Sequence, residues 1–383
     1  MREQSSAEGA AAEPAAAEGS ENRAASEDSE ASRGGFARYF GLLFRPMDRR
    51  WTVFLLCCVA AGGAWGFCFR MDQIATLNAE AERRRSGLTE APEEASSPSF
   101  DLSVTTIAAD EILSGGVRKD GIPALSSPEF VAAANATHLF PKDRVIGIQL
   151  GGQARAYPIR ILDFHEIVND RVRDLPLAVT WCPLCDSSAV FDRRTPLGER
   201  EFGVSGRLYN SNVLMYDRGG DPESLWSQIL GHGVSGPAAG QTLQLLPHEL
   251  TTWQDWLQRY PWTTVLSVNT GHRRNYRESP YAGYLADSQS LMFPVNRRDD
   301  RLPPKTPVLG ILAGKSSLAI PATVLSGSAG SLEQQIDGLS FTVEYDPESH
   351  NVRVTDAGDG IRWMYSFWFA WSAMHPETSL VTR

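Results

Sequence analysis

The chain has 383 residues, of which 42% are hydrophobic and 21% charged, and its formal net charge at pH 7 is −10. This composition excludes a purely disordered protein, because so many apolar side chains can build the core of one large or two ordinary domains. The acidic balance provides no broad stripe of lysine and arginine, so we expect no nucleic acid as a partner.

Residues 1–50 are predicted to form a disordered acidic tail with an arginine-rich end. Up to residue 32 the tail consists mainly of Ala, Glu, Ser and Gly, with eight acidic residues against two arginines. Such a segment buries too little apolar surface to offset the entropy lost on ordering.

Residues 51–70 predict a transmembrane helix. The run 51–69 is free of charge and is bracketed by Arg49, Arg50 and Arg70. At about 1.5 Å per residue, such a helix just crosses a hydrocarbon core of about 30 Å. The long preceding tail argues against a cleaved signal peptide, and the arginines slightly favour a cytoplasmic N-terminus. We therefore expect a single-pass anchor in membrane lipid, with the C-terminal domain extracytoplasmic, in a bacterial periplasm.

After a linker over 71–104, residues 105–383 predict one mainly β domain of α+β class. The runs 144–150 and 153–159, joined by Gly151-Gly152, are typical of a hairpin. No βαβ alternation appears, which favours antiparallel sheets or a barrel-like β domain with a few short helices. No fixed-period repeat and no nucleotide-binding glycine motif is present. Further strands are expected at 177–181, 188–191, 201–204, 212–216, 264–267, 340–345 and 351–355, and helices at 127–134 and 249–260.

Cys182 and Cys185, in the motif Cys-Pro-Leu-Cys, are the only cysteines outside the apolar run. This spacing is typical of a redox dithiol or of half a thiolate metal site, for which Zn or Cu(I) would suit the soft ligands. A small structural disulfide is the alternative, although so short a loop would restrict the unfolded chain little. The following residues 186–192 read as a strand, so the helix that follows a thioredoxin-like motif is not expected.

His165 is the predicted third member of this site. If a hairpin turns near residues 173–174, residues whose numbers add to about 347 lie opposite each other, which pairs His165 with Cys182. The imidazole would then act as base, as counter-ion to a thiolate, or as a third metal ligand. A fourth ligand could be water, His375, His232 or Glu166.

Polar residues near these motifs are candidates for substrate binding. Their alternative role is in turns, where such side chains bond their own backbone. The candidates are Glu166, Asn169, Ser205, Tyr209, Asn210 and Ser211.

Six motifs in order resemble the bacterial and archaeal family called domain of unknown function 3179. The resemblance implies an exported or membrane-tethered domain. Some members are named as selenoproteins, which implies redox or soft-metal chemistry at Cys182 and Cys185; no established activity comes with the family. The motifs are V-I-G-I-Q-L-G-G-Q-A-R-A-Y-P (145–158), H-E-I-V-N-D (165–170), V-T-W-C-P-L-C (179–185), F-G-V-S-G-R-L-Y-N-S (202–211), S-L-W-S-Q (224–228) and F-W-F-A-W (367–371).

The sequence thus favours a membrane-anchored extracytoplasmic protein with a thiol-based redox or soft-metal centre at Cys182, Cys185 and His165. Two alternatives stay open. One is a non-catalytic module that binds a small molecule or a partner protein and contains a structural disulfide. The other is a metal storage or delivery protein.

Overall fold

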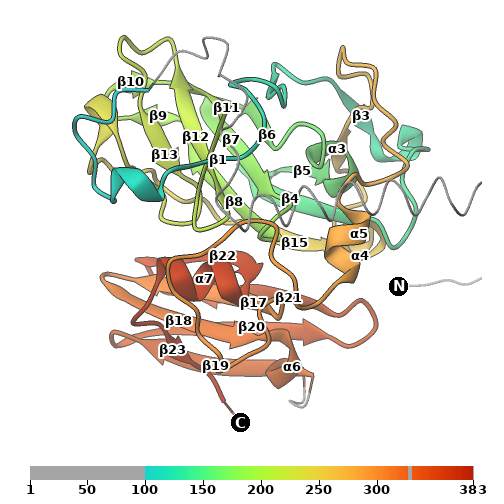
Figure 1. Cartoon of the computed structure of the whole chain (residues 1–383). Coiled ribbons are helices and arrows are strands. Elements are labelled where there is room, and N and C mark those ends of the chain that lie inside the picture. Colours follow the sequence, from blue (N-terminus) through green and yellow to red (C-terminus); the bar gives the residue numbers. More distant parts are fainter. Residues whose placement is uncertain (1–99, 327–329, 383) are drawn as a thin grey trace, which may run out of the picture. The chain divides into compact units, whose positions relative to one another are not determined.

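The computed structural model describes residues 100–326 and 330–382, which lie in one compact unit, Glu94–Arg383 (Figure 1). The predicted tail, the span at 51–70 and most of the linker lie outside the described residues. Among the helices that are described, none is long and apolar enough to cross a membrane.

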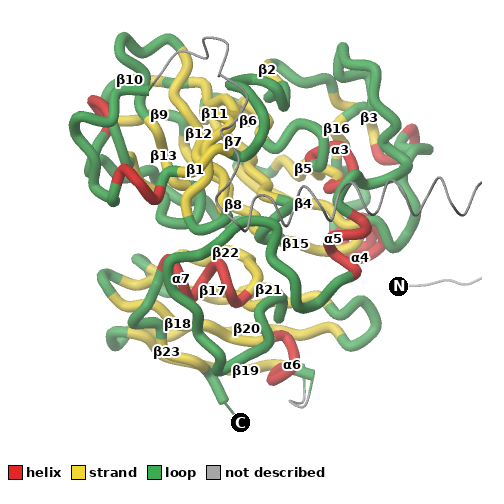
Figure 2. The backbone as a smooth tube through the Cα atoms, in the orientation of Figure 1, coloured by secondary structure: helices red, strands yellow, loops and turns green. Residues whose placement is uncertain are grey.

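The described residues form a mainly β fold with a few short helices, as the period-two pattern predicts (Figure 2). An eight-stranded sheet consists, in spatial order, of β2 (Leu125–Ser126), β6 (Ile167–Val172), β7 (Leu175–Cys182), β8 (Ser187–Asp192), β22 (Ile361–Phe367), β17 (Pro307–Ala313), β18 (Ser316–Pro321) and β23 (Ser379–Leu380). A five-stranded sheet consists of β15 (Glu249–Thr252), β4 (Arg144–Leu150), β5 (Gln153–Pro158), β16 (Thr264–Leu266) and β3 (Phe130–Ala132).

Smaller sheets and short helices complete the unit. A second five-stranded sheet consists of β1 (Leu113–Ser114), β11 (Glu201–Tyr209), β12 (Asn212–Arg218), β13 (Leu225–Ser227) and β14 (His232–Gly233). β19 (Ser331–Ile336), β20 (Leu339–Asp346) and β21 (Asn351–Ala357) form a meander, and β9 (Arg194–Thr195) pairs with β10 (Gly198–Glu199). The helices are α3 (Ile159–Leu162), α4 (Trp253–Arg259), α5 (Ala282–Ala286), α6 (Ala322–Leu325) and α7 (Trp368–Met374), with 3-10 turns η1 (Ala109–Glu111), η2 (Ala133–Asn135) and η3 (Gly236–Ala238).

Pairing between distant strands overrides two local predictions. The helix expected at 127–134 is wrong: the segment contains β3 and η2, because β3 pairs with β16. The helix expected at 249–260 begins only at Trp253, where the Thr252 hydroxyl accepts a hydrogen bond from the Asp255 amide, and the residues before it pair with β4. The hairpin at Gly151-Gly152 is confirmed, with φ of +56° and +78° at the two glycines. Among the described strands three pairs are parallel, two in the eight-stranded sheet and one in the sheet that contains β4, so these two sheets are mixed.

Two parts of the chain repeat one arrangement of strands and helices. Each begins with a hairpin and a one-turn helix, β4–β5–α3 or β17–β18–α6, with equivalent residues 163 positions apart, such as Val145 and Val308. A three-stranded meander follows, β6–β8 or β19–β21, and then a strand–helix–strand unit, β15–α4–β16 or β22–α7–β23. In both repeats the last strand runs parallel to the second hairpin strand.

Individual contacts repeat as well. The indole Nε1 of Trp256 donates to Thr263 Oγ1 at 2.9 Å, and Trp371 Nε1 donates to Thr378 Oγ1 at 2.9 Å. The spacing is 164 residues in the meanders, and because the first repeat alone contains the insertion β9–β14, it falls to 115 residues at the helices. The duplication therefore has no fixed period, which is why the sequence pattern did not indicate it.

The meander of each repeat lies against a strand of the other repeat. β8 of the first repeat pairs with β22 of the second at Ser188 and Tyr365, and in the reverse direction Asn351 of β21 donates to the Thr251 hydroxyl of β15. One hydrophobic core accordingly contains side chains of both repeats. The strand that follows the cysteines, β8, is thus held against the sheet of the other repeat.

Candidate dithiol site

Cys182 and Cys185 lie in the turn between β7 and β8. Cys182 ends β7 and pairs with Ser187, and the Cys185 amide closes the turn by donating to the Cys182 carbonyl at 3.1 Å. Asp186 leaves the turn with φ of +47°, and β8 follows directly, so no helix follows the motif, as the sequence predicts. Both thiols are free and buried, with 1% and 0% exposure.

The two sulfur atoms converge on the carbonyl oxygen of Ser211, in the left-handed turn between β11 and β12. The distance is 3.3 Å from Cys185 Sγ and 3.9 Å from Cys182 Sγ. Burial raises the pKa of Cys182, but hydrogen bonds from the Cys185 thiol and from backbone amides outweigh it, and the pKa lies below its usual value. Burial and the neighbouring Cys182 raise the pKa of Cys185 well above its usual value. Cys182 is therefore the thiol that ionises first.

A buried amide network holds this turn in place. Asn212 Nδ2 donates to Gln228 Oε1 at 2.8 Å, and Gln228 Nε2 donates to Thr180 Oγ1 at 3.2 Å. The Ser187 hydroxyl joins the same network through Gln228. Because these polar groups are paired, the network fixes the insertion strand β12 against β7 and β8.

Glu166 is the carboxylate beside Cys182. Its backbone oxygen accepts a hydrogen bond from the Trp181 amide at 2.8 Å, and its side chain is 6% exposed. Burial, followed by the charges of Cys182 and Asp163, raises its pKa well above the usual value. Within the described residues this carboxylate has no hydrogen-bond partner.

His165 lies elsewhere, although the predicted hairpin register is confirmed. Ile167 pairs with Thr180, so residue numbers across β6 and β7 add to 347. The ladder begins at Ile167, however, because Glu166 takes a left-handed conformation with φ of +55°. The predicted pairing of His165 with Cys182 does not form. Its ring nitrogens instead contact Pro123 O and Tyr276 Oη, each at 2.7 Å.

A long segment covers the dithiol. We define residues 281–296, which include α5, as the strap; its apolar side chains pack against the cluster that contains both cysteines. The Tyr284 hydroxyl donates to Leu184 O at 2.8 Å, and the Ser211 hydroxyl donates to Phe293 O at 2.8 Å. Lys305, which is 8% exposed, donates to the carbonyls of Tyr284 and Asp287 and lies over the Tyr284 ring. Sequence analysis missed the strap, since it has no motif and reaches the cysteines only through tertiary contacts.

A family model described as a protein of unknown function, DUF3179, matches residues 119–359. The chain belongs to the DUF3179 family. The matched region contains both cysteines and both meanders and ends before His375. No curated protein and no solved structure matches the chain. Family membership confirms the resemblance and carries no activity with it.

The other predicted residues of this DUF3179 protein separate into two groups. Asn210 and Ser211 lie in the turn at the dithiol, where Asn210 Oδ1 accepts the Asn296 amide of the strap at 2.8 Å. Asn169 bonds both backbone groups of Phe202, and Ser205 bonds the carbonyl of Leu214; these side chains join strands. Tyr209 Oη accepts a hydrogen bond from Asn296 Nδ2 at 3.4 Å, at the end of the strap.

The residues do not fit a three- or four-ligand zinc or copper site at the cysteines. Across residues 100–326 and 330–382, no three His, Cys, Asp or Glu side chains are grouped to hold a metal ion. His165 uses both nitrogens elsewhere, and the His375 ring stacks on Trp371 with 4.2 Å between centroids. Burial and then His232 lower the pKa of His375 to about 4.

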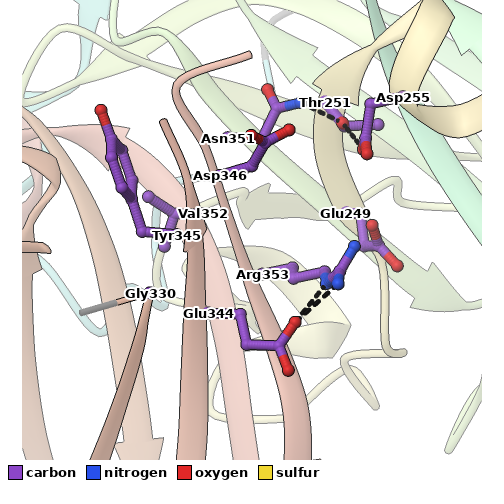
Figure 3. Close-up of a pocket in the computed structure, with 10 residues that line it drawn as sticks. All are labelled: Glu249, Thr251, Asp255, Gly330, Glu344, Tyr345, Asp346, Asn351, Val352 and Arg353. Atoms are coloured by element: carbon purple, nitrogen blue, oxygen red, sulfur yellow. Dashed lines mark hydrogen bonds and ion pairs between the residues drawn. The ribbon is translucent and has the colours of Figure 1, made fainter. Parts of the chain in front are cut away.

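The second repeat carries a pocket where the first carries the dithiol (Figure 3). Asp346 and His350 occupy the positions of Cys182 and Asp186, and the Tyr345 amide donates to Gly330 O at 3.0 Å, as Trp181 does to Glu166. The pocket has a volume of about 70 Å³, and Arg353 is paired with Glu344 beside it. A larger cavity of about 440 Å³ lies between the two turns and is lined by residues of both, Asp186 and His350.

Proposed function

We propose that this protein is a membrane-anchored extracytoplasmic thiol–disulfide oxidoreductase whose reactive group is Cys182 with Cys185. The observation that carries the proposal is the convergence of two free, buried thiols on one carbonyl oxygen, that of Ser211. Two free thiols brought together within one turn are an arrangement from which a disulfide can form.

The pKa values of the two thiols are shifted in opposite directions, which supports a different role for each thiol in the exchange. Cys182, with its lowered pKa, attacks the substrate disulfide as the thiolate, and Cys185 then attacks Cys182 to release the substrate. The raised pKa of Cys185 keeps it protonated until the mixed disulfide has formed, so that it serves as hydrogen-bond donor to the Cys182 thiolate in the resting state.

The proposal is tested on the full chain purified in detergent. After incubation in glutathione buffers of graded potential, the fraction of free thiol should follow a two-electron curve with a midpoint in the physiological range. Cys182→Ser should abolish exchange with glutathione disulfide, whereas Cys185→Ser should form a lasting mixed disulfide at Cys182. A bridge that resists reduction at every potential would instead favour a structural disulfide.

A further inference from the structure

The duplication supplies an internal comparison for Glu166. Its counterpart in the second repeat is Gly330, and both residues are left-handed, with φ of +55° and +85°. The two carbonyl groups accept equivalent hydrogen bonds, from Trp181 and from Tyr345. The backbone geometry of this position is therefore required by the fold in both repeats.

The two residues differ in how well they suit that geometry. Glycine adopts a left-handed conformation without steric cost, whereas a residue with a Cβ atom is strained there. Glu166 also places an ionisable carboxyl group in a residue that is only 6% exposed, which favours the neutral form of that group. The repeat without thiols has the residue that the fold prefers, and the repeat with thiols does not.

We propose that Glu166 is retained, against the preference of the fold, to carry the proton of the dithiol. This inference rests on the proposed function. The Glu166 carboxyl group gives its proton to the departing substrate sulfur as the Cys182 thiolate attacks the substrate disulfide. The bond from Cys182 to one substrate sulfur forms, and the substrate S–S bond breaks with release of the first thiol. Cys185 then attacks Cys182, Glu166 takes back a proton from Cys185, and the second substrate sulfur leaves as a thiolate, so one disulfide is reduced and one is formed.

The groups around Glu166 favour the protonated form of its carboxyl group. Burial, followed by the charges of Cys182 and Asp163, raises its pKa, and burial followed by the charge of Glu166 raises the pKa of the strap residue Tyr281. Arg144 is paired bidentately with Asp186, and its charge partly offsets the rise in the pKa of Asp163 that burial causes. No described cation contacts the Glu166 carboxylate itself.

The test compares Glu166→Gly and Glu166→Gln with the wild-type full chain. Arg173→Gly is the matched control, since Arg173 is also left-handed, with φ of +53°, but lies exposed at the far end of β6. Glu166→Gly is expected to unfold at an equal or higher urea concentration, and both Glu166 variants to exchange with glutathione disulfide at least about tenfold more slowly. Arg173→Gly should exchange at the wild-type rate.

The pH profile of Cys182 alkylation by iodoacetamide separates a proton carrier from a structural residue. The wild-type profile should deviate from a one-proton curve, because two coupled groups titrate together, and the Glu166 variants should follow a one-proton curve. Unchanged exchange and alkylation in these variants, or a loss of stability in Glu166→Gly, would overturn the inference. If the wild type does not exchange with glutathione disulfide while its alkylation profile still depends on Glu166, the redox proposal fails and the coupling stands.

Discussion

At the scale of single residues, Glu166 determines where its neighbour points. Because its φ is +55°, the chain enters β6 with the alternation of side chains broken, and Glu166 lies near Cys182 instead of His165. The strand register could be read from the sequence, but a left-handed glutamate could not, because glutamate has no preference for that conformation. A prediction based on strict alternation therefore places His165, and not Glu166, beside Cys182.

Gly310 shows how strongly one Cβ atom can matter. Added at Gly310, a Cβ would overlap the ring of Trp371, and one added at Gly147 would overlap Trp256 in the same way. We expect Gly310→Ala to lower the free energy of unfolding by about 1–3 kcal/mol through overpacking. Urea denaturation of the full chain measures this.

The control for Gly310 is Gly283→Ala, in α5, where nothing lies within 4 Å of the added atom. Alanine is the better helix former, so this change should leave the urea midpoint equal or slightly higher. Equal midpoints for Gly310→Ala and the wild type would show that the helix α7 adjusts freely to the sheet.

At the scale of elements, the part of the strap after α5 is attached without backbone–backbone hydrogen bonds within the described part of the chain. No backbone–backbone hydrogen bond involves residues 287–302 among the described residues, so this segment is held by side chains. Segments with few backbone hydrogen bonds open at low free-energy cost. Since both thiols are buried, the proposed exchange requires the strap to open before a disulfide substrate reaches Cys182.

Lys305 should control that opening. Lys305→Met removes two hydrogen bonds to strap carbonyls and the contact of the ammonium group with Tyr284. A loss of about 1.4 kcal/mol of strap attachment would raise the alkylation rate of the native thiols about tenfold. Mass spectrometry of iodoacetamide-treated protein measures the rate.

The duplication provides a control for this change. Lys142 occupies the position equivalent to Lys305 in the first repeat and is exposed, so Lys142→Met should leave the alkylation rate unchanged. Similar acceleration by both variants would mean that lysine removal acts through general destabilisation and not through the strap.

At the scale of the whole molecule, the contacts of each meander with the other repeat make the two repeats one folding unit. β8 pairs with β22, and one core combines side chains such as Ile146 and Leu309 from the two repeats. Fragments 1–299 and 300–383 should each lack native near-ultraviolet circular dichroism and regain it when mixed. A native spectrum from fragment 300–383 alone would show that the second repeat is an independent domain.

Buried histidines should make the folded state sensitive to acid. Burial lowers the pKa of His248 to about 4, against an unperturbed value of about 6.5 in the unfolded chain. The unfolded state therefore binds a proton first as pH falls, so stability is lost from about pH 6.5 down to about pH 4. His165 and His375 have pKa values of about 4 for the same main reason.

The expected size of this effect is at most about 1.4 kcal/mol per pH unit for each fully buried histidine. Urea midpoints measured at pH 7, 6 and 5 would show the decline, and His248→Gln should reduce its slope. Equal midpoints at pH 7 and pH 5 would contradict the assignment of neutral buried histidines.

The sequence by itself determined the local features of this protein. Alternating apolar residues determined most strands, Gly151-Gly152 determined a hairpin, and the spacing of Cys182 and Cys185 determined that two thiols share one turn. The duplication also left a trace in the sequence, in the similar segments P-K-D-R-V-I-G-I (141–148) and P-K-T-P-V-L-G-I (304–311). An insertion in one repeat concealed its period.

The tertiary structure alone decided which groups surround the thiols. Ser211 comes from an insertion, Tyr284 from a segment without a motif, and Phe367, whose amide donates to Cys185 O at 2.7 Å, from the other repeat. These contacts join residues far apart in sequence, and their formation depends on loop closure and on core packing, which no local pattern encodes. For the same reason the role proposed for Glu166 follows only from a comparison with Gly330, its counterpart in the second repeat.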